Sequence, residues 1–204
     1  MVERLACLLV GYACGCFLTA EAVVRSRLGK SAFDVGSRNP GMSNVGALLG
    51  AKWAAATLAG DILKTVAGCV LARYAIAPAL GLVAVAWGGL GVALGHDFPL
   101  WHRFRGGKSV AVTCSVVVLL DPLRGFASLA VGLAVVLATR QLCFGALAIV
   151  AVWCVAAFLL FGLGEVFAIS AVLAGIMLAK HGGAAWRALH GEEAETNLFT
   201  KSRK

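Results

Sequence analysis

Long stretches without charge dominate this sequence, and a clear example runs from residue 144 to residue 161. It contains no charged side chain. As a helix it is long enough to cross most of the hydrocarbon core of a bilayer, which is about 30 Å thick. Of the 204 residues, 60% are hydrophobic and only 14% are charged, whereas soluble domains contain about 45–50% apolar and about 25% charged residues. An ordinary soluble domain is therefore excluded, and a membrane protein is expected.

Similar apolar segments recur along the chain and predict an all-α fold, a polytopic membrane bundle with about seven transmembrane helices. The expected spans are residues 5–20, 53–71, 78–94, 110–120, 126–138, 144–161 and 166–179. The fourth is short for a span of about 20 residues, so we expect it to tilt or to lie sheltered inside the bundle. The prediction is one integral membrane domain over residues 1–204, with a polar C-terminal tail over about 181–204.

The basic residues predict how this bundle is oriented. With the N-terminus outside and seven crossings, thirteen of the eighteen Lys and Arg residues fall on the inner side and only three fall outside, in agreement with the positive-inside rule. The protein is therefore expected in the cell (plasma) membrane with a cytoplasmic C-terminus. The first polar loop (residues 31–44), the central loop (residues 95–109) and the tail then share the cytoplasmic face. The net charge of +8 suits anionic lipid headgroups or phosphorylated substrates rather than nucleic acid, because no soluble basic face exists to hold a duplex.

The central loop gathers polar and basic residues in an otherwise apolar chain. It contains two histidines, two arginines, a lysine, a Gly-Gly pair and a proline. Gly106 and Gly107 free backbone N–H groups to face a ligand, and a helix that starts near Lys108 directs its positive dipole end to the same place. This pattern predicts an anion site, most simply for phosphate. The alternative is a positive-inside loop that only fixes topology.

Two other polar groups each have a functional and a structural interpretation. Ser37, Asn39 and Asn44 in the first polar loop suit hydrogen bonding to phosphate or hydroxyl oxygens, but the same residue types build ordinary turns. Asp61 and Lys64 lie three residues apart, on one face of a helix inside an expected span. Ionisable residues at that depth are costly and indicate function by default, and a structural ion pair explains them equally well.

The remaining reactive residues give little sign of metal or nucleophilic chemistry. The four histidines form no metal-binding pattern, and no G-x-S-x-G nucleophile motif is present. Residues 106–109 do not complete a Walker A motif, G-x-x-x-x-G-K-S, because position 102 is His102 rather than glycine. The seven cysteines lie in apolar stretches without C-x-x-C spacing and are interpreted as small packing residues. No metal and no cofactor is expected.

Three motifs, in the same order along nearly the whole chain, resemble those of the bacterial acyl-phosphate:glycerol-3-phosphate acyltransferases of the PlsY type. Residues 36–44 resemble the family's GSGNxGxxN loop, and Gly60, Asp61 and Lys64 resemble a Gly-Asp-x-x-Lys stretch that follows it. Residues 95–111 resemble the motif GHxFPxxxxFxGGKGVA. His181, followed by residues 191–193, resembles a histidine with a later G-x-E.

This resemblance implies a seven-span enzyme of phospholipid biosynthesis. The enzyme would transfer an acyl group from acyl-phosphate to the sn-1 hydroxyl of glycerol 3-phosphate, giving lysophosphatidic acid and phosphate. Its partners would be these substrates, membrane lipids and the enzyme that supplies acyl-phosphate. The residues assigned to substrate and phosphate binding are Ser37, Arg38, Asn39, Asn44, His96, Gly106, Gly107 and Lys108. His181 and Glu193 would be catalytic, orienting the substrate or helping a proton to move.

Four positions depart from the family pattern. Arg38 and Ser109 stand where the family usually has glycine. Ala47 and Ala184 stand where it usually has arginine and asparagine. Arg38 is a candidate for the missing positive charge. The two alanines favour the alternative function, a non-catalytic relative or small transporter that binds a phosphorylated solute.

Overall fold

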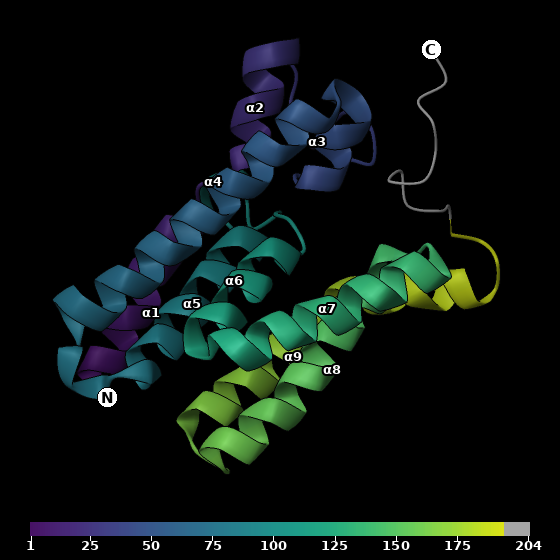
Figure 1. Ribbon diagram of the computed structural model, residues 1–204. Coiled ribbons are helices and arrows are strands. Elements are labelled where there is room, and N and C mark those ends of the chain that lie inside the picture. The colour runs from purple at the N-terminus through teal and green to yellow at the C-terminus, as the bar shows by residue number, and fades with distance from the viewer. Residues whose placement is uncertain (194–204) are drawn as a thin grey trace. The chain divides into compact units, whose positions relative to one another are not determined.

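The computed structural model describes residues 1–193, and the regular segments of this part of the chain are all helical (Figure 1). The all-α prediction is confirmed. The chain forms two compact units, an N-terminal unit of residues 1–112 and a C-terminal unit that begins at Thr113. The expectation of a single domain over residues 1–204 stays a prediction. Of the expected polar tail, residues 194–204 lie outside the described residues.

Helices long and apolar enough to cross a membrane agree with a polytopic membrane protein. In the described chain the candidate spans are Val2–Leu28 (which consists of two successive helices), Ala51–Ile76, Pro122–Thr139, Leu142–Phe161 and Glu165–Leu189. The spans expected at 78–94 and 110–120 correspond to two shorter helices, α5 (Leu82–Asp97) and α6 (Val110–Leu120). Both are shorter than the roughly 20 residues of a typical span. The count of seven crossings and the outside position of the N-terminus stay predictions.

The first expected span is divided into two helices. Three residues separate α1 (Val2–Gly15) from α2 (Thr19–Leu28). The carbonyl oxygens of Gly15 and Phe17 accept hydrogen bonds from Lys64 Nζ at 3.4 and 2.8 Å. A lysine from another helix thus satisfies backbone groups that a continuous helix would satisfy internally.

Close packing in the N-terminal unit depends on glycine. α1 lies along α5, and α4 (Ala51–Val70) contacts both helices. A Cβ atom at Gly11 of α1 would overlap the backbone carbonyl of Gly88 on α5. Backbones approach this closely in membranes where small residues line the contact. The packing fixes the end of α5, where His96 lies.

Shorter helical segments complete this unit. α3 (Met42–Leu49) follows the first polar loop. The single turns and short segments are η1 (Leu71–Ile76), η2 (Pro78–Leu80) and η3 (Leu100–His102). A buried apolar cluster beneath the first polar loop joins α2 and α3 to it, and its members are Ala20, Val24, Ala32 and Val45.

The described part of the C-terminal unit contains most of α6 and three longer helices that pack in sequence, α7 (Pro122–Thr139), α8 (Leu142–Phe161) and α9 (Glu165–Leu189) (Figure 1). Asp121 caps α7, since its Oδ1 accepts a hydrogen bond from the backbone N–H of Arg124 at 2.8 Å. The buried Trp153 ring of α8 donates to Ser170 Oγ of α9 at 3.0 Å. This contact holds α9, the helix that carries His181.

Candidate active site

Four polar side chains form one buried array in the N-terminal unit: Thr19, Asp61, Lys64 and His96. Lys64 Nζ lies 2.9 Å from Asp61 Oδ1 and 2.7 Å from His96 Nδ1. Thr19 Oγ1 donates to the same Asp61 oxygen at 3.1 Å. Asp61, Lys64 and His96 are only 3%, 8% and 5% exposed. An ammonium group only donates hydrogen bonds, so His96 Nδ1 accepts and the ring proton lies on Nε2.

The ammonium group of Lys64 is fully occupied within the protein. Its three short contacts go to Asp61, His96 and the carbonyl of Phe17, and a longer one goes to the carbonyl of Gly15. A buried charge is tolerated when it is paired and hydrogen-bonded in this way. The ion pair that the structural interpretation expects is therefore present, and its contacts link the α1–α2 junction to α5.

The central loop rests on the histidine of this array. The backbone N–H of Gly107 donates to the carbonyl of His96 at 3.0 Å. A Cβ atom at Gly106 would overlap that carbonyl, and one at Gly107 would overlap the His96 ring. The Gly-Gly pair is thus required by close packing, and the expectation that its N–H groups face a ligand is corrected at Gly107. Lys108, the next residue, is half-buried, and α6 begins at Val110, close to the expected helix start.

Two of the departures from the family pattern occupy left-handed backbone. Arg38 has a φ of 58° and Ser109 a φ of 43°, a region that glycine adopts without the steric cost that a Cβ atom brings. The glycine that the family pattern has at both positions fits these angles. At Ser109 the buried hydroxyl donates to Asp97 Oδ2 at 2.9 Å, a contact that glycine lacks and that offsets part of the strain.

Buried side chains shape the first polar loop. Asn44 Oδ1 accepts from the backbone N–H of Ser37 at 2.9 Å, and its Nδ2 donates to the carbonyls of Ala32 and Val35 at 3.3 and 3.2 Å. Glu21 of α2 accepts from the backbone N–H of Ala32 at 2.7 Å. The amide of Asn44 is therefore used to hold the loop rather than presented to a ligand.

The predicted binding residues of the N-terminal unit thus separate into two groups. Asn44, His96, Gly106 and Gly107 support the two loops from within. The residues that the loops present are Ser37 and Arg38, which are exposed, and Asn39 and Lys108, which are half-buried. Their side chains are a hydroxyl, an amide and two cations, which suits the binding of an anion.

The two residues predicted to be catalytic lie in the C-terminal unit. His181 is buried on α9. The Glu193 carboxylate accepts from Arg187 Nε at 2.7 Å, and its backbone carbonyl accepts from Gln141 Nε2 at 3.3 Å. Arg187 therefore neutralises this carboxylate. Ala184, where the family usually has asparagine, belongs to a buried apolar cluster of the same unit.

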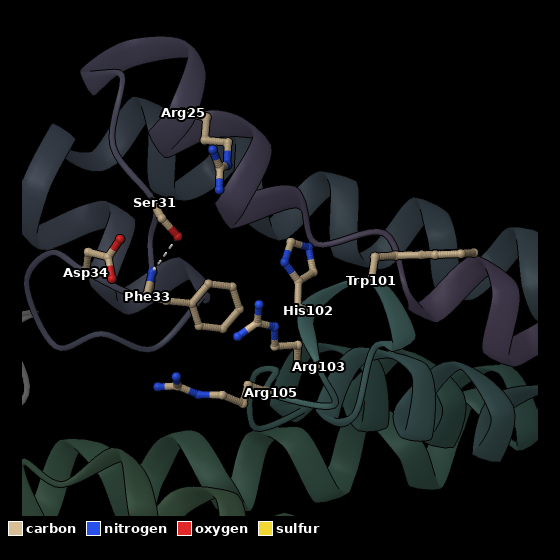
Figure 2. A pocket seen from close by; sticks show the side chains of 8 residues that line it. All are labelled: Arg25, Ser31, Phe33, Asp34, Trp101, His102, Arg103 and Arg105. Atoms are coloured by element: carbon tan, nitrogen blue, oxygen red, sulfur yellow. Dashed lines mark hydrogen bonds between the residues drawn. The ribbon is translucent and has the colours of Figure 1, made fainter.

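A basic pocket of the N-terminal unit was not predicted from the sequence (Figure 2). It has a volume of about 380 Å³. It is lined by Arg25 of α2, by Ser31, Phe33 and Asp34 of the first polar loop, and by Trp101, His102, Arg103 and Arg105 of the central loop. Part of the pocket could have been found from the sequence, because Arg103 and Arg105 belong to the basic central loop. Nothing in the spacing connected them with Arg25.

The fold and the loops define a polytopic helical membrane protein in which loops between the helices present basic and polar side chains. The family model for glycerol-3-phosphate acyltransferase matches residues 5–191. The chain belongs to this family, so the resemblance seen in the motifs is confirmed and the protein is an acyltransferase.

Individual relatives agree with this assignment. The chain is 36% identical to the glycerol-3-phosphate acyltransferase of Thioalkalivibrio sulfidiphilus (strain HL-EbGR7) in an alignment that covers 100% of this chain and 98% of that protein. It is 41% identical over 132 residues to glycerol-3-phosphate acyltransferase 1 of Lactobacillus acidophilus. That alignment covers 65% of this chain and spans 63% of the relative's length.

A solved structure extends the agreement to the fold. PlsY (YgiH), an integral membrane glycerol 3-phosphate acyltransferase, matches in its glycerol 3-phosphate form with a TM-score of 0.85 and 25% identity. The match covers 97% of this chain and 99% of that chain. The lysophosphatidic acid form of the same protein has the same fold, with a TM-score of 0.83 and 24% identity.

Proposed function

We propose that the protein transfers an acyl group from acyl-phosphate to the sn-1 hydroxyl of glycerol 3-phosphate at the cytoplasmic face of the cell membrane. The family supports the acceptor, because relatives along the whole chain are glycerol-3-phosphate acyltransferases and PlsY has been solved in a glycerol 3-phosphate form. The excess of basic residues on the expected inner side supports the face. The comparisons favour this function over solute binding without chemistry.

The reaction needs no covalent enzyme intermediate. The acceptor hydroxyl oxygen attacks the acyl carbon, and the bond from that carbon to the phosphate oxygen breaks. Phosphate leaves with the bonding electrons, and the hydroxyl proton passes to a base. Because acyl-phosphate is already an activated donor, positioning and stabilisation of charge supply most of the rate. The same reactivity favours a source of acyl-phosphate close to this protein, which we take to be the enzyme that makes it.

The roles follow from which side chains the loops present. Lys108, Ser37 and Asn39 bind phosphate oxygens, and Arg38 supplies a second cation in place of the arginine that is missing at position 47. For His181 and Glu193 of the C-terminal unit, the role rests on the family resemblance alone: they orient the acceptor and assist movement of its proton. Asn44, His96, Gly106 and Gly107 are positioning residues, because their contacts hold the loops.

The match of the whole chain to the acyltransferase family carries this proposal, and the packing of Gly107 on His96 carries the role of Lys108 within it. The contact between Gly107 and His96 fixes the loop that contains Lys108 to the buried array of His96, Lys64 and Asp61. A cation held in place before the reaction stabilises developing negative charge without reorganisation, which is commonly the largest catalytic contribution.

The test is an assay of the 204-residue protein, purified in detergent micelles, with acyl-phosphate and glycerol 3-phosphate. Lysophosphatidic acid and phosphate are expected in equal amounts, and only when both substrates are present. A reaction without glycerol 3-phosphate controls for simple hydrolysis of the donor. If glycerol 3-phosphate binds but no lysophosphatidic acid forms, the proposal is wrong and the solute-binding alternative is favoured.

A further inference from the structure

The basic pocket contains more positive charge than its own carboxylate can neutralise. Arg25, Arg103 and Arg105 line it together with one acidic side chain, Asp34. Arg25 is paired with Glu21 on its own helix. Among the residues that the structure describes, none forms an ion pair or hydrogen bond with the guanidinium group of Arg103 or Arg105. Figure 2 shows both groups extending from the central loop toward the first polar loop.

The two loops are tied together beside this pocket. The ring of His102 in the central loop lies 5.3 Å from the ring of Phe33 in the first polar loop, centroid to centroid. Arg103 and Phe104 both adopt left-handed backbone, with φ values of 54° and 59°. Such angles are unfavourable for residues with a Cβ atom and persist where the surroundings impose them. The arginines therefore project from a constrained turn.

Exposed apolar side chains surround these cations along the central loop. Leu100, Trp101 and Phe104 are 52%, 68% and 57% exposed. Tryptophan and other apolar side chains interleaved with arginine are typical of segments that lie at the headgroup level of a membrane. The pocket is therefore suited to meet ligands whose charged part lies at that level.

We propose that the basic pocket binds a terminal phosphate group at the membrane surface, at a place separate from the site assigned to Lys108. None of Ser37, Arg38, Asn39 or Lys108 lines the pocket. The planar guanidinium groups of two arginines match phosphate oxygens in paired hydrogen bonds, which single ammonium groups do not. This phosphate group is either the headgroup of a lipid such as phosphatidic acid or the free inorganic phosphate ion. The assignment does not depend on the transfer reaction proposed above.

The test measures binding to the detergent-purified Lys108→Ala protein, so that the site assigned to catalysis does not contribute. The probes are dihexanoyl phosphatidic acid, dihexanoyl phosphatidylcholine and inorganic phosphate, with binding followed by microscale thermophoresis. In this background, Arg103→Gln with Arg105→Gln is expected to weaken phosphatidic acid binding at least about tenfold, since each charge-assisted contact is worth about tenfold or more in affinity. The matched control is Lys30→Gln with Lys52→Gln, two exposed cations outside the pocket, and it is expected to leave binding unchanged.

The outcomes separate the sources and can overturn the proposal. Competition by inorganic phosphate at similar concentration identifies free phosphate as a ligand, and lack of competition identifies the lipid-borne group. Equal binding by the arginine pair variant and the control pair overturns the proposal, as does equal affinity for phosphatidylcholine. If the glutamine pair lowers the thermal unfolding midpoint, Arg103→Lys with Arg105→Lys replaces it. This pair keeps the charge but loses the planar fork, so intermediate weakening is expected, and unchanged binding overturns the proposal.

Discussion

The two polar loops of the N-terminal unit are held in place by opposite means. In the first polar loop a buried side chain reaches the backbone, because Asn44 bonds to Ser37, Ala32 and Val35. In the central loop the backbone itself packs against His96, with no room for a Cβ atom at Gly107. The first loop should therefore be sensitive to the loss of a side chain, and the central loop to the addition of one.

The largest effect is expected at Lys108, the cation that the central loop presents. Lys108→Ala should lower turnover about 10²–10³-fold, the usual cost of removing one group that stabilises charge in the transition state. The unfolding midpoint should hardly change, because a half-buried loop lysine contributes little packing. Lys108→Arg should rescue only part of the activity, since a planar fork differs from a compact ammonium group. Near-normal turnover of Lys108→Ala, with Lys30→Ala as the exposed control, would remove the phosphate role from this loop.

Adding one methyl group to the central loop should have the next largest effect. Gly107→Ala places a Cβ atom against the ring of His96, and overpacking of this kind costs about 1–3 kcal/mol. Because Lys108 is the adjacent residue, turnover is expected to fall about tenfold or more. Gly175→Ala is the matched control, since a Cβ atom there meets nothing within 4 Å. Equal turnover of the two variants would show that Gly107 does not position Lys108.

Removing a side chain should damage the first polar loop more moderately. Asn44→Ala leaves one backbone N–H and two carbonyls without their partner, at a cost of about 1–3 kcal/mol. We expect a lower thermal unfolding midpoint and a raised KM for glycerol 3-phosphate. Ser26→Ala, which removes an exposed hydroxyl on α2, serves as the control. An unchanged KM for Asn44→Ala would mean that the loop shape does not matter for the acceptor.

The smallest effects are expected at Arg38, where stability and activity should change in opposite directions. Arg38→Gly relieves a left-handed φ of 58°, worth about 1–2 kcal/mol of stability, but removes a cation from the first polar loop. Activity should therefore fall, and Ala47→Arg in that background should restore part of it. A double-mutant cycle should give a coupling of about 0.5–3 kcal/mol. Strictly additive effects on activity would show that Arg38 does not replace the missing arginine.

Much of the fold was predictable because it depends on local composition, whereas the support of the site depends on distant contacts. Apolar runs predicted an all-helical membrane protein, and the three-residue spacing of Asp61 and Lys64 predicted that they share one helix face. The hydrogen bond from Lys64 to Gly15 links residues 49 positions apart, and no local pattern indicates it. No local pattern indicated that Arg25 and the central-loop arginines line one pocket either, because they lie far apart in the sequence.

The junction between α1 and α2 has a consequence for how the protein enters its membrane. The carbonyls of Gly15 and Phe17 accept hydrogen bonds from the ammonium group of Lys64. During translation, these two residues are synthesised before Lys64. Inside lipid each polar group without a partner costs several kcal/mol, and Asp61 on the same helix supplies only one of the partners that Lys64 has in the folded protein. We therefore expect the first stable inserted intermediate to be the pair of segments Val2–Leu28 and Ala51–Ile76 rather than the first segment alone. A truncation or fusion between them would separate the carbonyls from the cation that satisfies them.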